Sequence, residues 1–124
     1  MSDTTPRAVL DALDERDGHV CAWLGYDTGR LVPQHRQGGM GGRRGKHRLS
    51  NVVWLDSILN GEIEASAELQ AEARRRGIKI SGHADPEDEP IVHAVHGRVR
   101  LLDDGTYRKA SDVPDVVDGW KVSS

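Results

Sequence analysis

Hydrophobic and polar positions at the start of the chain repeat with a helical period. Thr5 followed by Pro6 is a typical helix N-terminus, and apolar residues then recur on one helical face at positions such as Val9 and Leu13. Gly18 interrupts this repeat. We therefore expect a short, acidic, amphipathic helix before the main body of the fold.

Short apolar runs after this helix predict a β-hairpin. Residues 20–24 and 30–32 read as its two strands, with a turn at 26–29 between them. Because proline lacks a backbone N–H group, Pro33 is expected to end the second strand. This interpretation places His35 directly after the hairpin.

The middle of the chain contains a glycine-rich segment and the clearest helical pattern. Five of the ten residues from 37 to 46 are glycine, so this segment is expected to form a loop. Residues 52–55 form an apolar run that is typical of a buried strand or of the lead-in to a helix. Acidic residues open the segment 62–76, arginines close it and Gly77 follows it, which predicts one continuous helix.

The last third of the chain has a pattern of strands and turns. In order, it predicts a strand over 78–80, an acidic loop over 85–90, strands over 91–95 and 99–102, and a turn over 103–105. No internal repeat and no shift in composition divides the chain. We therefore expect one domain over residues 1–124, with an α+β fold.

Composition narrows the class of protein. With 124 residues, 36% hydrophobic residues and no Phe, the core must be small and aliphatic. No run of residues is long and apolar enough to cross a bilayer, and the N-terminus lacks the pattern of a signal peptide, so we expect a cytoplasmic protein without membrane contact. The single cysteine, Cys21, excludes an internal disulfide and is expected to be buried.

Positive charge gathers in one segment although the net charge is −3. Residues 30–48 carry cations and no acidic residue; these are Arg30, Arg36, Arg43, Arg44, Lys46 and Arg48. A phosphate backbone would be attracted to such a segment. The ordinary alternative is a solvated loop, which is what most charge runs form.

Three residues in this part of the chain indicate a specific chemistry. His35, Asn51 and Asn60 follow one another in the order and rough spacing of the HNH nuclease motif, and the basic glycine-rich loop lies between the first two. Hydrolysis of a phosphodiester needs a group that takes a proton from water and a group that stabilises the leaving oxygen. A histidine beside one divalent cation supplies both.

Over roughly residues 20–105 the chain resembles the HNH endonuclease-like proteins of actinobacteria and their phages. The segments that carry this resemblance are Gln34-His35-Arg36 with the glycines that follow, Leu49-Ser50-Asn51, Asn60-Gly61-Glu62-Ile63-Glu64-Ala65, Ala73-Arg74-Arg75-Arg76-Gly77-Ile78-Lys79-Ile80, Glu89-Pro90-Ile91-Val92-His93-Ala94 and Leu101-Leu102-Asp103-Asp104-Gly105. The resemblance implies a ββα-metal (His-Me finger) core over about residues 20–80, with a C-terminal hairpin and tail over 81–124.

The resemblance also implies a role for each matching residue. His35 would be the general base, and Asn51 would hydrogen-bond the backbone near His35. Asn60, Gln34 and Glu64 would hold one Mg²⁺ or Mn²⁺ ion through hard oxygen ligands. The phosphates of DNA would be bound by Arg36, Arg43, Arg44, Lys46 and Arg48. The implied function is that of a metal-dependent DNA endonuclease or nickase.

Two departures from the family pattern leave an alternative open. Gln34 stands where relatives often carry Asp, Glu or His, and a neutral amide is a weaker ligand. Asp56 and Leu59 stand where many relatives carry a second cysteine pair, so no structural zinc is expected. The chain is therefore either an active zinc-free enzyme or a degenerate member that binds DNA, or a phage or host protein, without cleavage. A regulatory protein that engages a basic partner through its acidic surfaces is a third interpretation.

Several of these residues also have ordinary explanations. Asn51 after a serine is a common helix cap, and Asn60-Gly61 is a common turn. Glu64 has an ordinary explanation too, because an acidic residue in the first turn of a helix is stabilised by the helix dipole. His93 and His96 would point to opposite faces if both lay on one strand, so we expect no joint metal site there.

Overall fold

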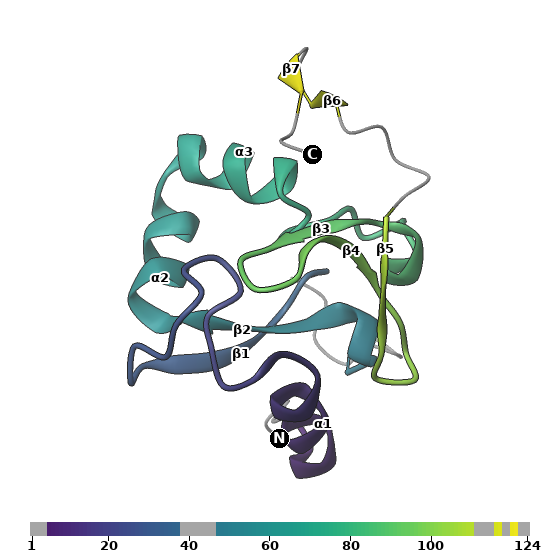
Figure 1. The fold of residues 1–124 in the computed structure, drawn as a ribbon. Coiled ribbons are helices and arrows are strands. Elements are labelled where there is room, and N and C mark those ends of the chain that lie inside the picture. Colours follow the sequence, from purple (N-terminus) through teal and green to yellow (C-terminus); the bar gives the residue numbers. More distant parts are fainter. Residues whose placement is uncertain (1–4, 38–46, 111–115, 118–119, 122–124) are drawn as a thin grey trace.

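The computed structural model describes residues 5–37, 47–110, 116–117 and 120–121, and within them the fold is of the mixed α+β class (Figure 1). The helices are α1 (Arg7–Asp17), α2 (Ser57–Ala65) and α3 (Ala67–Arg75), with short 3₁₀ turns η1 (Leu49–Asn51) and η2 (Pro86–Asp88). The strands are β1 (Leu31–His35), β2 (Val52–Asp56), β3 (Ile91–His93), β4 (Gly97–Leu101), β5 (Tyr107–Lys109), β6 (Val116–Val117) and β7 (Trp120–Lys121).

Antiparallel pairing organises all of these strands. β1 pairs with β2, the strands β3, β4 and β5 form a second sheet in that order, and β6 pairs with β7. The turn predicted at 103–105 joins β4 to β5, and Gly105 adopts a φ of 89° there. The predicted strand at 91–95 is confirmed in shortened form as β3, and the one at 99–102 is confirmed as β4, which begins two residues earlier and ends one residue earlier than predicted. The strand β5 carried no recognisable signal.

The predicted hairpin of residues 20–24 with 30–32 is wrong. The segment that follows α1 forms a compact turn, in which the N–H groups of Leu24 and Gly25 donate to Sγ and to the backbone oxygen of Cys21, at 3.4 and 2.7 Å. Residues 22–24 lie in this turn and not in a strand, and Gly25, which follows them, has a φ of 87°. Cys21 is completely buried, as expected.

The true partner of β1 is β2, beyond the glycine-rich loop. Their register pairs Leu31 with Asp56 and His35 with Val52. Pro33 lies inside β1 rather than at its end. Because Arg36 N–H donates to Asn51 O at 2.7 Å, the alternation of antiparallel pairs places Pro33 at a position that makes no hydrogen bond to β2. A missing N–H group therefore costs nothing at this position.

The helix predicted over 62–76 is divided in two. Ser66 ends α2 in an extended conformation, and its hydroxyl caps α3 by accepting a hydrogen bond from Leu69 N–H at 3.2 Å. Helix α2 begins earlier than the predicted start at residue 62, because the Asp56 side chain caps it by accepting a hydrogen bond from Leu59 N–H. Gly77 ends α3 as predicted, with a φ of 72°.

The core consists of two clusters that lie on opposite faces of β2. Val53 and Leu55 pack with α2, α3 and the β3–β4–β5 sheet, whereas Val52 and Trp54 pack against Leu13 of α1. Figure 1 shows α1 on one side of the β1–β2 hairpin and α3 with the larger sheet on the other. The hairpin is therefore the central layer of the fold.

Residues 78–80 do not form the predicted strand. Ile78 N–H donates a hydrogen bond to Ala73 O of α3 at 2.9 Å. Ile80 N–H donates one to the backbone oxygen of Arg36, directly after β1, at 3.1 Å. In the part of the chain that the structure describes, no helix has the length and apolar character needed to span a membrane.

Candidate functional site

The β1–β2 register determines which side of the hairpin each candidate residue faces. Residues that lie directly opposite in an antiparallel pair share a face. Gln34 lies opposite Val53, which packs in the same cluster as Ile63 of α2. His35 lies opposite Val52, on the face covered by α1. Gln34 therefore belongs to the α2 side of the hairpin and His35 to the α1 side, at the last position of β1.

Asn51 holds the chain that follows His35. Its side-chain oxygen accepts a hydrogen bond from Gln37 N–H at 2.9 Å, and its backbone oxygen accepts one from Arg36 N–H at 2.7 Å. Asn51 has no exposed surface. This is the kind of contact near His35 that the resemblance implies, and it is more than the simple helix cap that the sequence also allowed.

The His35 ring contacts a second histidine. Its Nε2 atom lies 3.1 Å from Nδ1 of His47, and the two ring centroids are 5.0 Å apart. One of these nitrogen atoms must carry the proton that the other accepts. Sequence reasoning missed His47, because no spacing rule connects a residue before the glycine-rich loop to one after it.

Asn60 and Glu64 both lie on α2, one turn apart. Asn60-Gly61 is therefore not a turn, because the Asp56 cap starts the helix before it. Oδ1 of Asn60 is buried and has no hydrogen-bond donor among the described residues. A buried oxygen without a donor is costly, so this atom is a natural ligand for water or for a cation. Asn60 shares a helix face with Ile63, which packs beneath β2.

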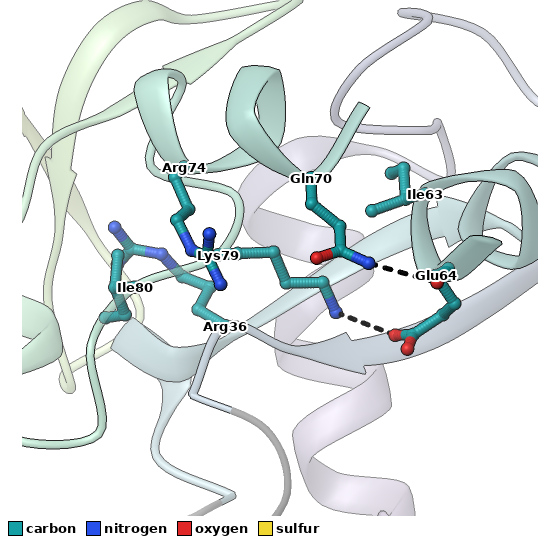
Figure 2. Close-up of a pocket in the computed structure, with 7 residues that line it drawn as sticks. All are labelled: Arg36, Ile63, Glu64, Gln70, Arg74, Lys79 and Ile80. Atoms are coloured by element: carbon teal, nitrogen blue, oxygen red, sulfur yellow. Dashed lines mark hydrogen bonds and ion pairs between the residues drawn. The ribbon is translucent and has the colours of Figure 1, made fainter. Parts of the chain in front are cut away.

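A pocket of about 280 Å³ lies beside Glu64 (Figure 2). It is lined by Arg36, Ile63, Glu64, Gln70, Arg74, Lys79 and Ile80. Lys79 Nζ lies 3.6 Å from Glu64 Oε2, and Gln70 Nε2 donates to the backbone oxygen of Glu64 at 3.0 Å. The two walls of this pocket are thus formed by α2 and α3, with Lys79 between them.

Arg36 does not have the role that the sequence predicted for it. Its side chain is buried, with 1% exposure for the whole residue, and donates to backbone oxygens of Gly77, Ser50, Pro86, Glu89 and Pro90 at distances of 2.7 to 3.4 Å. Burial lowers the pKa of Arg36 to about 10, so that it remains protonated at neutral pH. The guanidinium joins three separate segments and has no free donor face for a phosphate, so the prediction that Arg36 binds DNA is wrong.

Arg48 is also engaged within the protein. It forms ion pairs with Asp103 and Asp85 at 2.8 and 3.0 Å, and hydrogen bonding to Asp103 raises its pKa. Asp103 in turn accepts hydrogen bonds from Ser50. The other predicted phosphate contacts, Arg43, Arg44 and Lys46, lie outside the described residues.

The positions that the resemblance connects with cysteines have other functions here. Asp56 caps α2 and pairs with Arg30 at 2.8 Å. Leu59 packs against the cluster that contains Cys21. A helix cap and apolar packing therefore stabilise this corner of the fold.

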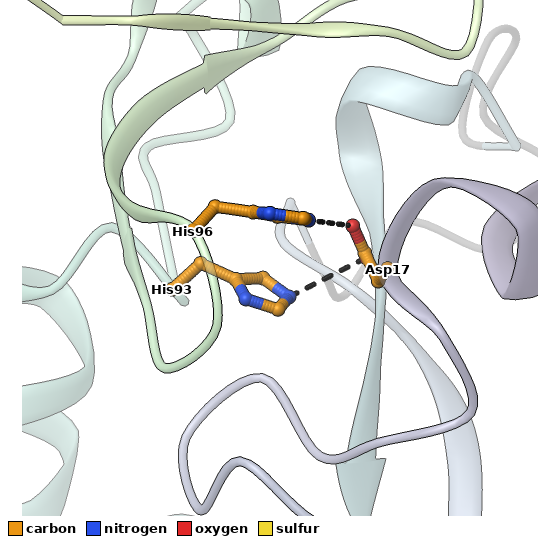
Figure 3. Close-up of side chains that lie close together, drawn as sticks. All are labelled: Asp17, His93 and His96. Atoms are coloured by element: carbon orange, nitrogen blue, oxygen red, sulfur yellow. Dashed lines mark hydrogen bonds and ion pairs between the residues drawn. The ribbon is translucent and has the colours of Figure 1, made fainter.

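A cluster that the sequence did not predict joins α1 to the β3–β4 turn (Figure 3). Asp17 lies 3.4 Å from His93 Nε2 and 2.9 Å from His96 Nε2. The expectation that the two histidines point to opposite faces is wrong, because β3 ends at His93 and His96 lies in the turn that follows. Their ring centroids are 4.6 Å apart. The ligand atoms of the three residues lie within 4.8 Å of one another, so this buried group could hold one metal ion.

The candidate ligand atoms of this group already make hydrogen bonds within the protein. Arg16 donates to both carboxylate oxygens of Asp17, at 2.7 and 2.6 Å, and neither side chain is exposed by more than 1%. His93 Nδ1 accepts a hydrogen bond from Val95 N–H at 3.1 Å, which leaves the proton of the neutral ring on Nε2, the atom that faces Asp17. An ion would have to displace that proton and share Asp17 with a guanidinium.

Comparison of the chain with protein-family models, with curated proteins and with solved structures finds no match.

Proposed function

We propose that this protein is a metal-dependent HNH-type DNA endonuclease or nickase, built on a ββα-metal core of β1, β2 and α2. The observation that carries the proposal is the buried Asn60 Oδ1, which lacks a donor among the described residues and lies on α2, one turn before the carboxylate of Glu64. An unsatisfied acceptor next to a carboxylate is typical of a cation site.

The donor set fits a hard divalent cation. Gln34, Asn60 and Glu64 offer oxygen atoms, which Mg²⁺ and Mn²⁺ prefer. Glu64 is available, since its side chain is 64% exposed and its pair with Lys79 is long, at 3.6 Å. When bound, such an ion stabilises charge on the leaving oxygen and acidifies a water molecule.

The role that this chain itself supplies is proton transfer at His35. An imidazole exchanges protons close to neutral pH, so it can take a proton from water at its ring nitrogen. Asn51 fixes the backbone directly after His35, and His47 orients the ring through the contact between Nε2 and Nδ1. His35 is positioned at a strand end rather than on a free loop, which limits the number of orientations that it can adopt.

The alternative function is a degenerate HNH-fold protein that binds DNA or a protein partner without cleavage. Three observations favour it. His35 lies on the α1 side of the hairpin, whereas Gln34 and α2, which carries Asn60 and Glu64, lie on the other side. Gln34 supplies only a neutral amide, and His35 Nε2 is already occupied by His47.

Cleavage of supercoiled plasmid in the presence of Mg²⁺, Mn²⁺ or EDTA tests the proposal. We expect metal-dependent nicking by the unchanged protein and by His83→Ala, a matched control at an exposed histidine, and no nicking by His35→Ala or Asn60→Ala. Nicking that survives His35→Ala would overturn the assigned base.

Gln34→Asp separates the two functions. If the unchanged protein binds DNA without cutting and Gln34→Asp cuts it, the chain is the degenerate member and the proposed enzyme is wrong. If both cut, we expect Gln34→Asp to need less Mg²⁺, since it adds a charged ligand.

A further inference from the structure

We propose that the pocket between α2 and α3 binds one phosphate of a nucleic-acid backbone, through Arg74 and Lys79. The choice of DNA as the source of that phosphate rests on the proposed function. This site lies at the C-terminal end of α3 and is separate from the contacts that the sequence predicted in the glycine-rich segment, which lie outside the described residues.

The three consecutive arginines at the end of α3 differ in their partners. Arg75 and Arg76 both pair with Glu72, and Arg76 also lies 4.4 Å from the ring centroid of Trp23. Within the described residues, the Arg74 side chain makes no hydrogen bond or ion pair, and it lines the pocket. Of the three arginines, Arg74 is thus the one whose charge no described residue compensates.

Figure 2 shows Gln70 and Arg74 extending from α3 toward Lys79. The Lys79 side chain is only 19% exposed, so its charge is less screened by water than that of a surface lysine. Its one carboxylate partner among the described residues, Glu64, is 3.6 Å away and 64% exposed, which makes this a weak pair. A phosphate oxygen can therefore compete with Glu64 for Lys79.

The charges around the pocket favour an anion. Arg74 and Lys79 line it, and the buried Arg36 lies behind it with backbone oxygens as its hydrogen-bond acceptors. Glu64 is the one acidic side chain among the lining residues. The local potential is therefore positive in a chain whose net charge is −3.

The size of the pocket agrees with this ligand. Its volume of about 280 Å³ is ample for one phosphate group. Ile80 is half-buried and forms an apolar wall, against which the sugar of a nucleotide can pack. The site also adjoins Glu64, so that a phosphate held here lies next to the proposed metal ligands.

Fluorescence anisotropy with a short labelled DNA duplex tests the site in EDTA, where no cleavage occurs. The variants are Arg74→Ala and Lys79→Gln, and the matched control is Arg75→Ala on the same helix. We expect each pocket variant to weaken binding about five- to tenfold at low salt and to reduce the slope of log K against log[salt] by about 0.9, with the control unchanged within about twofold. Circular dichroism verifies that each variant is folded.

The proposal is wrong if the pocket variants bind with the affinity and salt slope of Arg75→Ala, or if the unchanged protein does not bind DNA. Displacement of the duplex by millimolar inorganic phosphate at constant ionic strength would assign the pocket to small phosphate compounds and overturn the DNA assignment. These measurements need no metal, so the two proposals can fail separately. If the nuclease proposal is wrong, the protein binds DNA normally but does not cleave plasmid. If the phosphate pocket is wrong, cleavage is intact and the pocket variants bind DNA normally.

Discussion

The pocket beside α2 and the cluster at the end of α1 contain the same kinds of charged side chain in opposite states. In the cluster, Asp17 receives two hydrogen bonds from Arg16 and contacts two histidines, all shielded from solvent. In the pocket, Arg74 has no partner among the described residues and Lys79 has a weak one. Charges that satisfy one another stabilise the fold, whereas charges left unsatisfied at an accessible site remain available to a ligand.

The cluster also connects distant parts of the chain. Arg16 of α1 donates to the backbone oxygens of Leu49 and Val52, at 2.8 and 3.1 Å. Asp17 joins the same helix to the β3–β4 turn through His93 and His96. Three segments thus meet at one ion pair, and we expect the stability of the fold to depend on it.

The largest expected effect comes from breaking this pair. Asp17→Asn keeps the shape of the side chain but leaves the buried Arg16 without its counter-charge, and the free energy of unfolding should fall by about 3–5 kcal/mol. Urea denaturation measures the loss. Asp11→Asn on the exposed face of α1 is the control, because its pair with Arg7 is solvated and should contribute at most about 1 kcal/mol. An equal effect of both variants would contradict this role of the cluster.

The pH dependence of stability tests the same pair. Burial alone raises the pKa of Asp17, but hydrogen bonds from His93 and Arg16 and the charge of Arg16 outweigh it, so that the net pKa is well below its usual range. A carboxylate with a lowered folded pKa contributes stability that is complete above the unfolded value of about 3.9 and is lost as the pH falls below it. The difference in stability between the unchanged protein and Asp17→Asn should therefore shrink below about pH 4.

Among the cations that line the pocket, Arg36 resembles the residues of the Asp17 cluster, because it is buried and its donors are satisfied within the protein. Arg36→Lys keeps the charge but cannot reach all five backbone oxygens, so we expect a loss of about 2–4 kcal/mol in the free energy of unfolding. Arg74→Lys, at a side chain without partners in the described structure, should change it by less than about 0.5 kcal/mol. Thermal or urea unfolding of the two variants would contradict the comparison if their losses were similar.

Two asparagines give a smaller contrast of the same kind. Asn51→Ala removes the acceptor of Gln37 N–H in a buried site and should cost about 2 kcal/mol. Asn60→Ala removes an oxygen that has no donor and introduces a better helix former, so stability should stay within about 0.5 kcal/mol or rise. If Asn60→Ala were as destabilising as Asn51→Ala, Asn60 would be a structural residue and not a candidate ligand.

The smallest expected effect concerns zinc at the cluster. Because Arg16 and the His93 proton already occupy Asp17, we expect Zn²⁺ near 100 µM to stabilise the protein by less than about 0.5 kcal/mol, the value reached when ligand concentration equals Kd. Thermal unfolding with and without the ion measures this shift. A larger shift that disappears in His96→Gln would show that the group does hold an ion.

Some elements of the fold could be predicted from the sequence and others could not. The helix that ends at Gly18, the buried strand at 52–55 and the turn at 103–105 were predictable, because each depends on neighbours in sequence. The break at Ser66 was missed because a serine cap competes with a continuous helical pattern, and local propensity does not show which prevails. The pairing of β1 with β2 was missed because the two strands are separated by the glycine-rich segment, whose residues do not indicate which strands pair.

The candidate sites show the same division. His35, Asn51, Asn60 and Glu64 came from the order of residue types, and the tertiary structure adds what each of them touches. Arg36 was misassigned because sequence shows a charge but not whether backbone oxygens surround it. The cluster of Asp17 with His93 and His96 could not be found from spacing, since 79 residues separate Asp17 from His96.

By itself, the sequence determined the helical and extended periods, the end of α1 at Gly18 and the identity of the groups able to exchange protons or bind cations. These properties are encoded locally, in side-chain chemistry and in the backbone preferences of glycine and proline. Only the tertiary structure decided which charges are neutralised. Desolvation and pairing depend on contacts between segments far apart in sequence, such as Arg16 with Asp17 against the β3–β4 turn. Among the described residues that line the pocket, these contacts leave Arg74 and Lys79 available to a partner.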